Sequence, residues 1–322
     1  MQMKNKPGRN GLYLLVSCLT FNWLDGIVQQ VKPLSFKEYN VARSSFYLFY
    51  EVGSWMLFWP CSWSVALAAP VGTLPDVSLL ALLGVGSVIM RSAGCTINDL
   101  WDSKYDAQVE RTNQRPLAAG TISTRKAIGF LGAQLSAGLL VLVQLNPYSI
   151  ALGASSLALV GTYPLFKRIT YWPQAVLGCT FNWGALVGWS AVHGECAWPV
   201  VLPLYAGGIA WTIVYDTLYA HQDKEDDQRI GLRSTALLFG EHTRPILTGF
   251  SLAAVAGMTA AGAAVDLSYP FYVGMGIAGS HLAWQVGTAK LDDPDNLATR
   301  FKANKWFGAL VFSSIVLGKV VI

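Results

Sequence analysis

The sequence predicts an all-α integral membrane protein, a bundle of about nine transmembrane helices. Of its 322 residues, 53% are hydrophobic and only 13% are charged, whereas soluble domains carry roughly 25% charged residues. Mean hydropathy is +0.39. Apolar runs long enough to cross about 30 Å of hydrocarbon recur along the whole chain, and Lys and Arg gather at alternate connections between these runs. No polar stretch is long enough to form a soluble domain.

Each expected span is one of these apolar runs, taken in chain order. The expected ranges are 46–70, 76–97, 124–144, 149–166, 173–193, 198–219, 245–264, 269–289 and 304–322. Residues 1–45 are then an N-terminal cytosolic or interfacial segment, and residues 46–322 form a single transmembrane domain.

Basic residues are distributed very unevenly between the expected connections. Lys and Arg precede the first span and follow the second, fourth, sixth and eighth, whereas the connections after the first, third, fifth and seventh contain none. Cytosolic loops are enriched in Lys and Arg, so the alternation supports nine spans and a cytosolic N-terminus. Only Arg91, inside the second span, and Lys319 fall outside it. The net charge of +4 reflects this sidedness and does not indicate nucleic-acid binding.

Two acidic clusters lie at the expected cytosolic edge, after the second and sixth spans. The first contains Asp99, Asp102 and Asp106, and the second contains Asp216, Asp223 and Asp227. On helices, the acids of the first cluster fall within about 60° of one another and those of the second within about 40°. A solvated helix end would explain one such stripe. Two acidic stripes at the same membrane face instead predict a site for Mg²⁺ and a diphosphate, because Mg²⁺ is held by one or two carboxylates plus substrate phosphates.

Basic side chains are interleaved with these carboxylates. Arg115 follows the first cluster, Lys167 and Arg168 end the fourth span, and Arg233 follows the second cluster. An allylic diphosphate carries about three negative charges, which Lys and Arg can neutralise together with metal ions. Anchoring at a cytosolic membrane surface would also place Lys or Arg at these positions, and that alternative stays open.

Several ordered motifs resemble the UbiA superfamily of intramembrane aromatic prenyltransferases, close to its 4-hydroxybenzoate polyprenyltransferase branch. The first family motif, Asn-Asp-x-x-Asp-x-x-x-Asp, is complete from Asn98 to Asp106, and the second is complete from Asp216 to Asp227. The resemblance covers about residues 46–322. Further similar stretches are 111–120, 163–168, 171–174, 181–185 and 291–294.

The resemblance implies a central cavity capped by cytosolic loops and a Mg²⁺-dependent reaction. A prenyl group would pass from an allylic diphosphate to a ring carbon of a phenolic acceptor, with release of diphosphate. The expected metal ligands, also catalytic, are Asp99, Asp102, Asp106, Asp223 and Asp227, joined by Lys167 as a catalytic cation. The expected diphosphate- and acceptor-binding residues are Asn98, Arg115, Tyr163, Arg168, Asp216, Tyr219, Lys224, Arg233 and Glu51. The base that removes the ring proton is not assigned.

The first span departs from the family pattern. Where the family often has a basic residue followed by Lys-Pro-x-Gly, this chain reads Tyr-Leu-Phe-Tyr-Glu-Val-Gly over residues 47–53, with Glu51 in an apolar helix. In the family that helix helps to form the acceptor pocket. We therefore expect an aromatic polyketide acid as acceptor and farnesyl diphosphate as donor, in meroterpenoid biosynthesis of the fungal type. The alternative is 4-hydroxybenzoate with a long polyprenyl donor, for ubiquinone.

The N-terminal segment bears on the membrane in which the protein resides. It is not rich in Arg and contains Asp25 and Glu38, unlike a mitochondrial transit peptide. We therefore expect an endoplasmic-reticulum-type membrane, with the mitochondrial inner membrane as the alternative. The expected partners are the prenyl diphosphate, the aromatic acceptor and the lipid bilayer, with no nucleic acid and no obligate protein partner.

An ion-coupled transporter is the rival functional class, because acids inside membranes also mark ion pathways. Transport predicts acids near the bilayer midplane, on helices broken by Gly or Pro. Here the acids gather at one edge, and the opposite connections contain only Asp76, Glu195 and Asp266. The pattern favours the enzyme.

Overall fold

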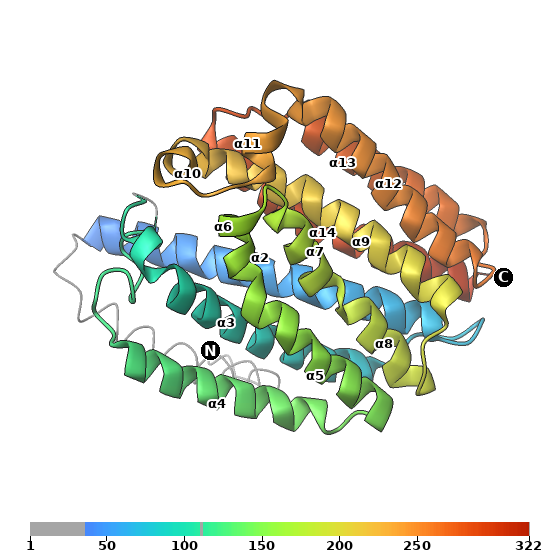
Figure 1. Ribbon diagram of the computed structural model, residues 1–322. Coiled ribbons are helices and arrows are strands. Elements are labelled where there is room, and N and C mark those ends of the chain that lie inside the picture. Colours follow the sequence, from blue (N-terminus) through green and yellow to red (C-terminus); the bar gives the residue numbers. More distant parts are fainter. Residues whose placement is uncertain (1–35, 110–111, 322) are drawn as a thin grey trace, which may run out of the picture.

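The computed structural model describes residues 36–109 and 112–321, with side chains from residue 52 onward (Figure 1). Within those ranges every regular element is helical, as predicted. The longer helices are α2 (Phe36–Ala68), α3 (Val77–Asp106), α4 (Thr124–Leu142), α5 (Pro147–Thr162), α7 (Pro173–Asn182), α8 (Gly184–His193), α9 (Trp198–Ala220), α12 (Thr243–Ala263), α13 (Tyr269–Gly287) and α14 (Pro294–Val320). The short elements are η1 (Tyr163–Leu165), α6 (Phe166–Ile169), η2 (His221–Asp223), α10 (Lys224–Ile230), α11 (Thr235–Phe239) and η3 (Gly240–His242).

Within the described residues, six helical stretches are long and apolar enough to cross a membrane. They are Val77–Asp106, Thr124–Leu142, Pro147–Ile169, Pro173–His193, Trp198–Ile230 and Thr235–Ala263. The other three expected spans coincide with α2, α13 and α14, which are not among the six, so the count of nine stays a prediction. Polar side chains lower the hydropathy of α13 and α14, and some of them pair between the two helices: Asn304 Nδ2 donates to Gln285 Oε1 at 2.9 Å.

Helix bounds differ from the expected spans at three places in the described chain. α3 continues to Asp106, so the first acidic cluster lies on an unbroken helix. The range 173–193 is divided at Trp183 into α7 and α8. α2 begins at Phe36, so the expected domain boundary at residue 46 falls inside a helix, and the division itself stays a prediction.

Small residues allow α8 to approach α2 closely. A Cβ added at Gly184 or Gly188 would collide with Cys61 of α2. Helices in membranes associate through such small residues, because lipid offers no hydrophobic driving force between them. Large side chains at these two glycines would therefore separate α2 from α8.

An aromatic core joins α2, α9 and α14. Trp63, Trp211 and Phe307 are fully buried, and the ring of Trp211 lies 5.3 Å from each of the other two rings. Both indole N–H groups are satisfied: Trp63 donates to the Gly308 carbonyl at 2.9 Å and Trp211 to Asn304 Oδ1 at 2.8 Å. Buried Trp residues usually need such a partner, so the core is both packed and hydrogen-bonded.

One end of the bundle collects the polar elements. In Figure 1, α3 and α9 run toward the same end, on the left, where α6, α10 and α11 also lie. The two acidic clusters stand at the C-terminal ends of these two long helices. Topology therefore places both clusters at one end of the bundle.

Candidate active site

A pocket of about 1070 Å³ lies between α3 and α9 and reaches α4, α5 and α7. Its charged end includes Asp99, Asp216, Asp223 and Asp227. Elsewhere the wall is largely apolar, with Met90, Leu135, Leu139, Leu142, Leu145 and Leu157 among the lining residues. The pocket thus joins a charged end to an apolar chamber. Capping of this pocket by cytosolic loops stays a prediction.

A second, small cavity of about 60 Å³ connects the two acidic clusters directly. Asp102 and Asp106 of α3 line it together with Asp223 and Asp227. Asp223 ends η2 and Asp227 lies on α10. Two motifs far apart in the sequence therefore face one small space.

Arg115 binds two carboxylates of the first cluster. Its Nη1 lies 3.0 Å from Asp99 Oδ1 and 3.0 Å from Asp106 Oδ2. Asp106 is buried, and Arg115 is about one third exposed. A single guanidinium thus neutralises much of the charge on two neighbouring acids and holds the loop after α3 against that helix.

Asp102, the most buried acid of the first cluster, is held by two cations from the end of the fourth span. Lys167 Nζ lies 3.2 Å from Asp102 Oδ2, and Arg168 Nη2 lies 3.3 Å from Asp102 Oδ1. Arg168 also donates to the Trp101 carbonyl at 2.8 Å and covers the ring of Tyr105. Arg168 lines neither pocket, whereas Lys167 lines both. Lys167 is therefore the better placed of the two to meet a ligand.

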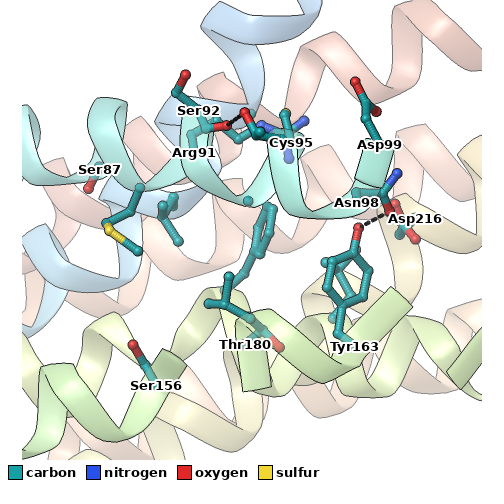
Figure 2. A pocket seen from close by; sticks show the side chains of 18 of the residues that line it. Ser87, Arg91, Ser92, Cys95, Asn98, Asp99, Ser156, Tyr163, Thr180 and Asp216 are labelled. Carbon is teal, nitrogen blue, oxygen red and sulfur yellow. Dashed lines mark hydrogen bonds between the residues drawn. The ribbon is translucent and has the colours of Figure 1, made fainter. Parts of the chain in front are cut away.

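Tyr163 and Asn98 form a polar pair beside these acids. The Tyr163 hydroxyl donates to Asn98 Oδ1 at 2.9 Å, as Figure 2 shows. Asn98 is buried on α3, and Tyr163 begins η1. Their bond ties the end of the fourth span to the first acidic cluster.

The second cluster is arranged differently. Asp216 projects from α9 toward Asn98 at the wall of the larger pocket (Figure 2). Its carboxylate makes no hydrogen bond or ion pair with any residue in the described part of the chain. Tyr219, about one turn later, packs against Phe301 with the ring centroids 4.6 Å apart and the rings tilted by 42°. Lys224 lines neither pocket.

Arg233 is not directed at the acids. Its Nη1 donates to the Ile169 carbonyl at 2.6 Å, and its guanidinium covers the ring of Tyr171. Its backbone N–H donates to the Lys167 carbonyl at 2.8 Å. Within the described chain no contact joins the Arg233 or Lys224 side chain to the carboxylates, but Arg233 lines the larger pocket. Their role as substrate ligands stays a prediction. Glu51 lies on α2, and its side chain is outside the described residues.

Arg91 is a pocket residue that was not included among the predicted site residues. It lies on α3, lines the larger pocket and covers the ring of Phe181 at 5.7 Å. A Cβ at Gly53 would collide with its guanidinium. The sequence contained a sign of this role, because Arg91 is a basic residue inside the second expected span. Charged residues inside a membrane are usually retained for function.

The acids on the small cavity suit a divalent cation. Carboxylate oxygens are the hard ligands that Mg²⁺ prefers. Among the residues that the structure describes, no three His, Cys, Asp or Glu side chains converge closely enough to form a complete metal cage. Mg²⁺ usually takes one or two carboxylates with substrate phosphates and waters. The open arrangement therefore fits an ion that is bound together with a diphosphate.

Comparisons with known proteins agree with this geometry. Residues 57–313 match the UbiA prenyltransferase family. The chain is 57% identical over 267 residues to the mitochondrial 4-hydroxybenzoate polyprenyltransferase of Drosophila melanogaster, a match that covers 83% of this chain and 68% of that protein.

Solved structures show the same fold. A UbiA homolog from Aeropyrum pernix K1 superposes with a TM-score of 0.68 at 25% identity, covering 82% of this chain and 97% of that one. A UbiA homolog from Archaeoglobus fulgidus, solved with GPP and Mg²⁺, superposes with a TM-score of 0.61 at 19% identity. The match covers 83% of this chain and 98% of that one.

Proposed function

The chain belongs to the UbiA prenyltransferase family, and on this basis we propose that it transfers a polyprenyl group from its diphosphate to a ring carbon of 4-hydroxybenzoate. It is a prenyl-transferring enzyme and a multi-pass membrane protein, as the sequence predicted, and not the ion-coupled transporter considered as a rival. The relative from Drosophila melanogaster favours 4-hydroxybenzoate over the meroterpenoid acceptor that we had preferred. Neither the fungal meroterpenoid subtype nor farnesyl diphosphate gains support.

The observation that carries the proposal is the continuity of the larger pocket. A prenyl diphosphate has a highly charged head and a long apolar tail, and the acceptor is an aromatic acid. The pocket offers carboxylates and cations at one end, apolar walls along its length, and Arg91 between them. Each chemical part of the two substrates therefore has a matching region.

Diphosphate binding would use the cations that now hold the first cluster. Arg115 and Lys167 line both cavities and are each about one third exposed, so they can reach a ligand while remaining near their carboxylates. Mg²⁺ held by acids of the two clusters, Asp99, Asp102, Asp106, Asp223 and Asp227, would supply positive charge against the leaving diphosphate. Arg115 and Lys167 would stabilise the remaining charge on the departing oxygen.

The acceptor carboxylate would bind Arg91. Its guanidinium presents a planar set of donors that matches a carboxylate, and the neighbouring Phe181 ring offers a face for an aromatic substrate. The apolar walls exclude water from the allylic cation that forms when the carbon–oxygen bond breaks. The electron-rich ring, rather than water, then attacks that cation.

The apolar chamber would accept the donor tail. The tail carbons would lie against Met90, Leu139, Leu142 and Leu157, because burial of each CH₂ contributes about 0.8 kcal/mol. The name of the Drosophila melanogaster relative also leads us to propose the mitochondrial inner membrane as the location. The endoplasmic-reticulum-type membrane that we expected gains no support.

The test is an acceptor and donor panel with the protein in liposomes. We expect a C-prenylated product from 4-hydroxybenzoate with long polyprenyl diphosphates, lost in EDTA and restored by Mg²⁺. 4-Hydroxybenzamide, which lacks the carboxylate, should be a poor acceptor for the wild type, and Arg91→Gln should remove the difference between the two acceptors. Product from an orsellinic-type acid with farnesyl diphosphate, but none from 4-hydroxybenzoate, would contradict the proposal.

A further inference from the structure

Asp216 differs from the other acids at the site by its surroundings. Asp99 and Asp106 are bound by Arg115, and Asp102 by Lys167 and Arg168. Asp216 lines the larger pocket but not the small cavity between the clusters, and the described structure gives it no cation within ion-pair distance. Asp216 thus faces the ligand space without a described ion-pair partner.

Helix geometry sets the position of Asp216 relative to the proposed acceptor site. Arg91 and Asn98 are seven residues apart on α3, which is nearly two full turns and about 10 Å along the axis. They therefore share one face of the helix, and Asp216 of α9 approaches this face at the level of Asn98 (Figure 2). A para-hydroxybenzoate ring fits within this separation. With its carboxylate on Arg91, its phenolic end points to Asn98, Tyr163 and Asp216.

That orientation also brings the reacting carbon to Asp216. The carbon that accepts the prenyl group must lie near the charged end of the pocket, where the diphosphate head would bind. The two ring carbons next to the phenolic carbon are on that side of the acceptor. Among the polar groups at this level, the Asn98 amide is not a base, and the Tyr163 hydroxyl already donates to Asn98.

We propose that Asp216 is the general base that removes the proton from the prenylated ring carbon, an assignment that rests on the proposed function. The C1–O bond breaks first, and diphosphate leaves with its electron pair. The ring π electrons then form the new bond to C1 of the prenyl cation. The ring carbon then carries both its hydrogen and the prenyl group. Asp216 takes that hydrogen as a proton, and the C–H electrons restore the aromatic ring.

The experiment compares wild type, Asp216→Asn and Asp216→Glu with 4-hydroxybenzoate and with the same acid deuterated at both carbons next to the phenolic carbon. Asp216→Asn keeps the size of the side chain and removes the base. We expect kcat to fall about 10²- to 10⁴-fold, with little change in the KM of either substrate. An isotope effect on kcat should appear in Asp216→Asn, because proton removal becomes rate-limiting. Asp216→Glu should restore part of the rate.

Diphosphate release separates this role from support of the metal site. Without acceptor, slow hydrolysis of the prenyl diphosphate should fall far less in Asp216→Asn than transfer does, because hydrolysis needs no proton removal from a ring carbon. Equal loss of hydrolysis and transfer, with no isotope effect, would instead make Asp216 part of the diphosphate site and overturn the assignment, as would a near-normal kcat. Product formation by the wild type tests the proposed function separately, before any variant is compared.

Discussion

The two acidic clusters look alike in sequence but differ in the folded protein. Both contain three aspartates, but the first three lie on α3, whereas Asp216, Asp223 and Asp227 lie on α9, η2 and α10. In the first, Arg115, Lys167 and Arg168 contact all three carboxylates at 3.0–3.3 Å. In the second, Asp216 has no such contact within the described chain, and Asp223 and Asp227 line the small cavity opposite the first cluster.

This difference teaches that the surrounding basic residues, and not the spacing of the acids, determine how each carboxylate is held. The first cluster is neutralised before any ligand arrives, so its geometry is held by ion pairs that are only partly exposed. In the second cluster, Asp216 makes no ion pair with any described residue and faces the larger pocket. Ion pairs thus fix the first cluster in place, whereas the Asp216 carboxylate of the second is directed to the larger pocket.

The largest expected effect comes from breaking the ion pairs of the first cluster. Asp102→Asn should lower turnover roughly 10³-fold, because it removes several kcal/mol of charge stabilisation. It also leaves Lys167 and Arg168 without their carboxylate. Since both cations are about one third exposed, the free energy of unfolding should fall by about 1–2 kcal/mol, between the values for surface and buried pairs.

Asp216→Asn is the matched control for stability. It neutralises an acid without a described ion-pair partner, so the melting temperature in detergent without Mg²⁺ should not fall. Thermal melts of both variants beside the wild type measure the difference. An equal decrease in both variants would show that the two clusters are held in the same way, against the comparison.

A smaller effect on the turnover rate is expected from a change at Arg233. The comparison with Lys167 tests whether Arg233 positions its neighbours or binds the diphosphate. Arg233→Lys keeps the charge but loses the planar contact with Tyr171, worth about 0.5–1 kcal/mol at exposed sites, so the rate should fall roughly 2- to 5-fold. The KM of the donor should change little, whereas Lys167→Gln should raise it strongly. A donor KM for Arg233→Lys raised as much as for Lys167→Gln would instead assign Arg233 to the diphosphate.

The smallest effect is expected at Asp76, an acid at the opposite end of α3 with a purely structural role. Its carboxylate accepts the backbone N–H groups of Leu79 and Ser78 at 3.1 and 2.8 Å, and these bonds lower the pKa of Asp76. Because the folded pKa is the lower one, this stabilisation is present above the unfolded pKa and is lost as pH falls through the folded pKa.

Asp76→Ala should therefore lower the melting temperature slightly at neutral pH, because α3 loses its N-cap. The difference from the wild type should disappear in strong acid, and enzyme activity should stay unchanged. Melting curves across an acid pH series measure this dependence. A difference that grew as the pH fell would contradict the capping role.

Patterns local in sequence predicted much of the fold and the site. The apolar runs indicated helices that the structure contains, and the spacing of Asp99, Asp102 and Asp106 gave the stripe on α3. Long-range pairing was not predictable in this way. The Arg233 and Lys224 side chains make no contact with the carboxylates in the described chain. Arg233 instead binds the Ile169 carbonyl and covers the ring of Tyr171, at the wall of the larger pocket.

The sequence by itself determined the helical class, the family and the two acidic motifs, because hydropathy and helical period are properties of neighbouring residues. Only the tertiary structure decided which cations neutralise which acids, and that Arg91 and Asp216 face one pocket from α3 and α9. These relations depend on how helices far apart in the chain cross and approach. Small residues such as Gly184 and Gly188 and the buried Trp63–Trp211 core fix those approaches, and their effect on distant side chains is not encoded in any local pattern.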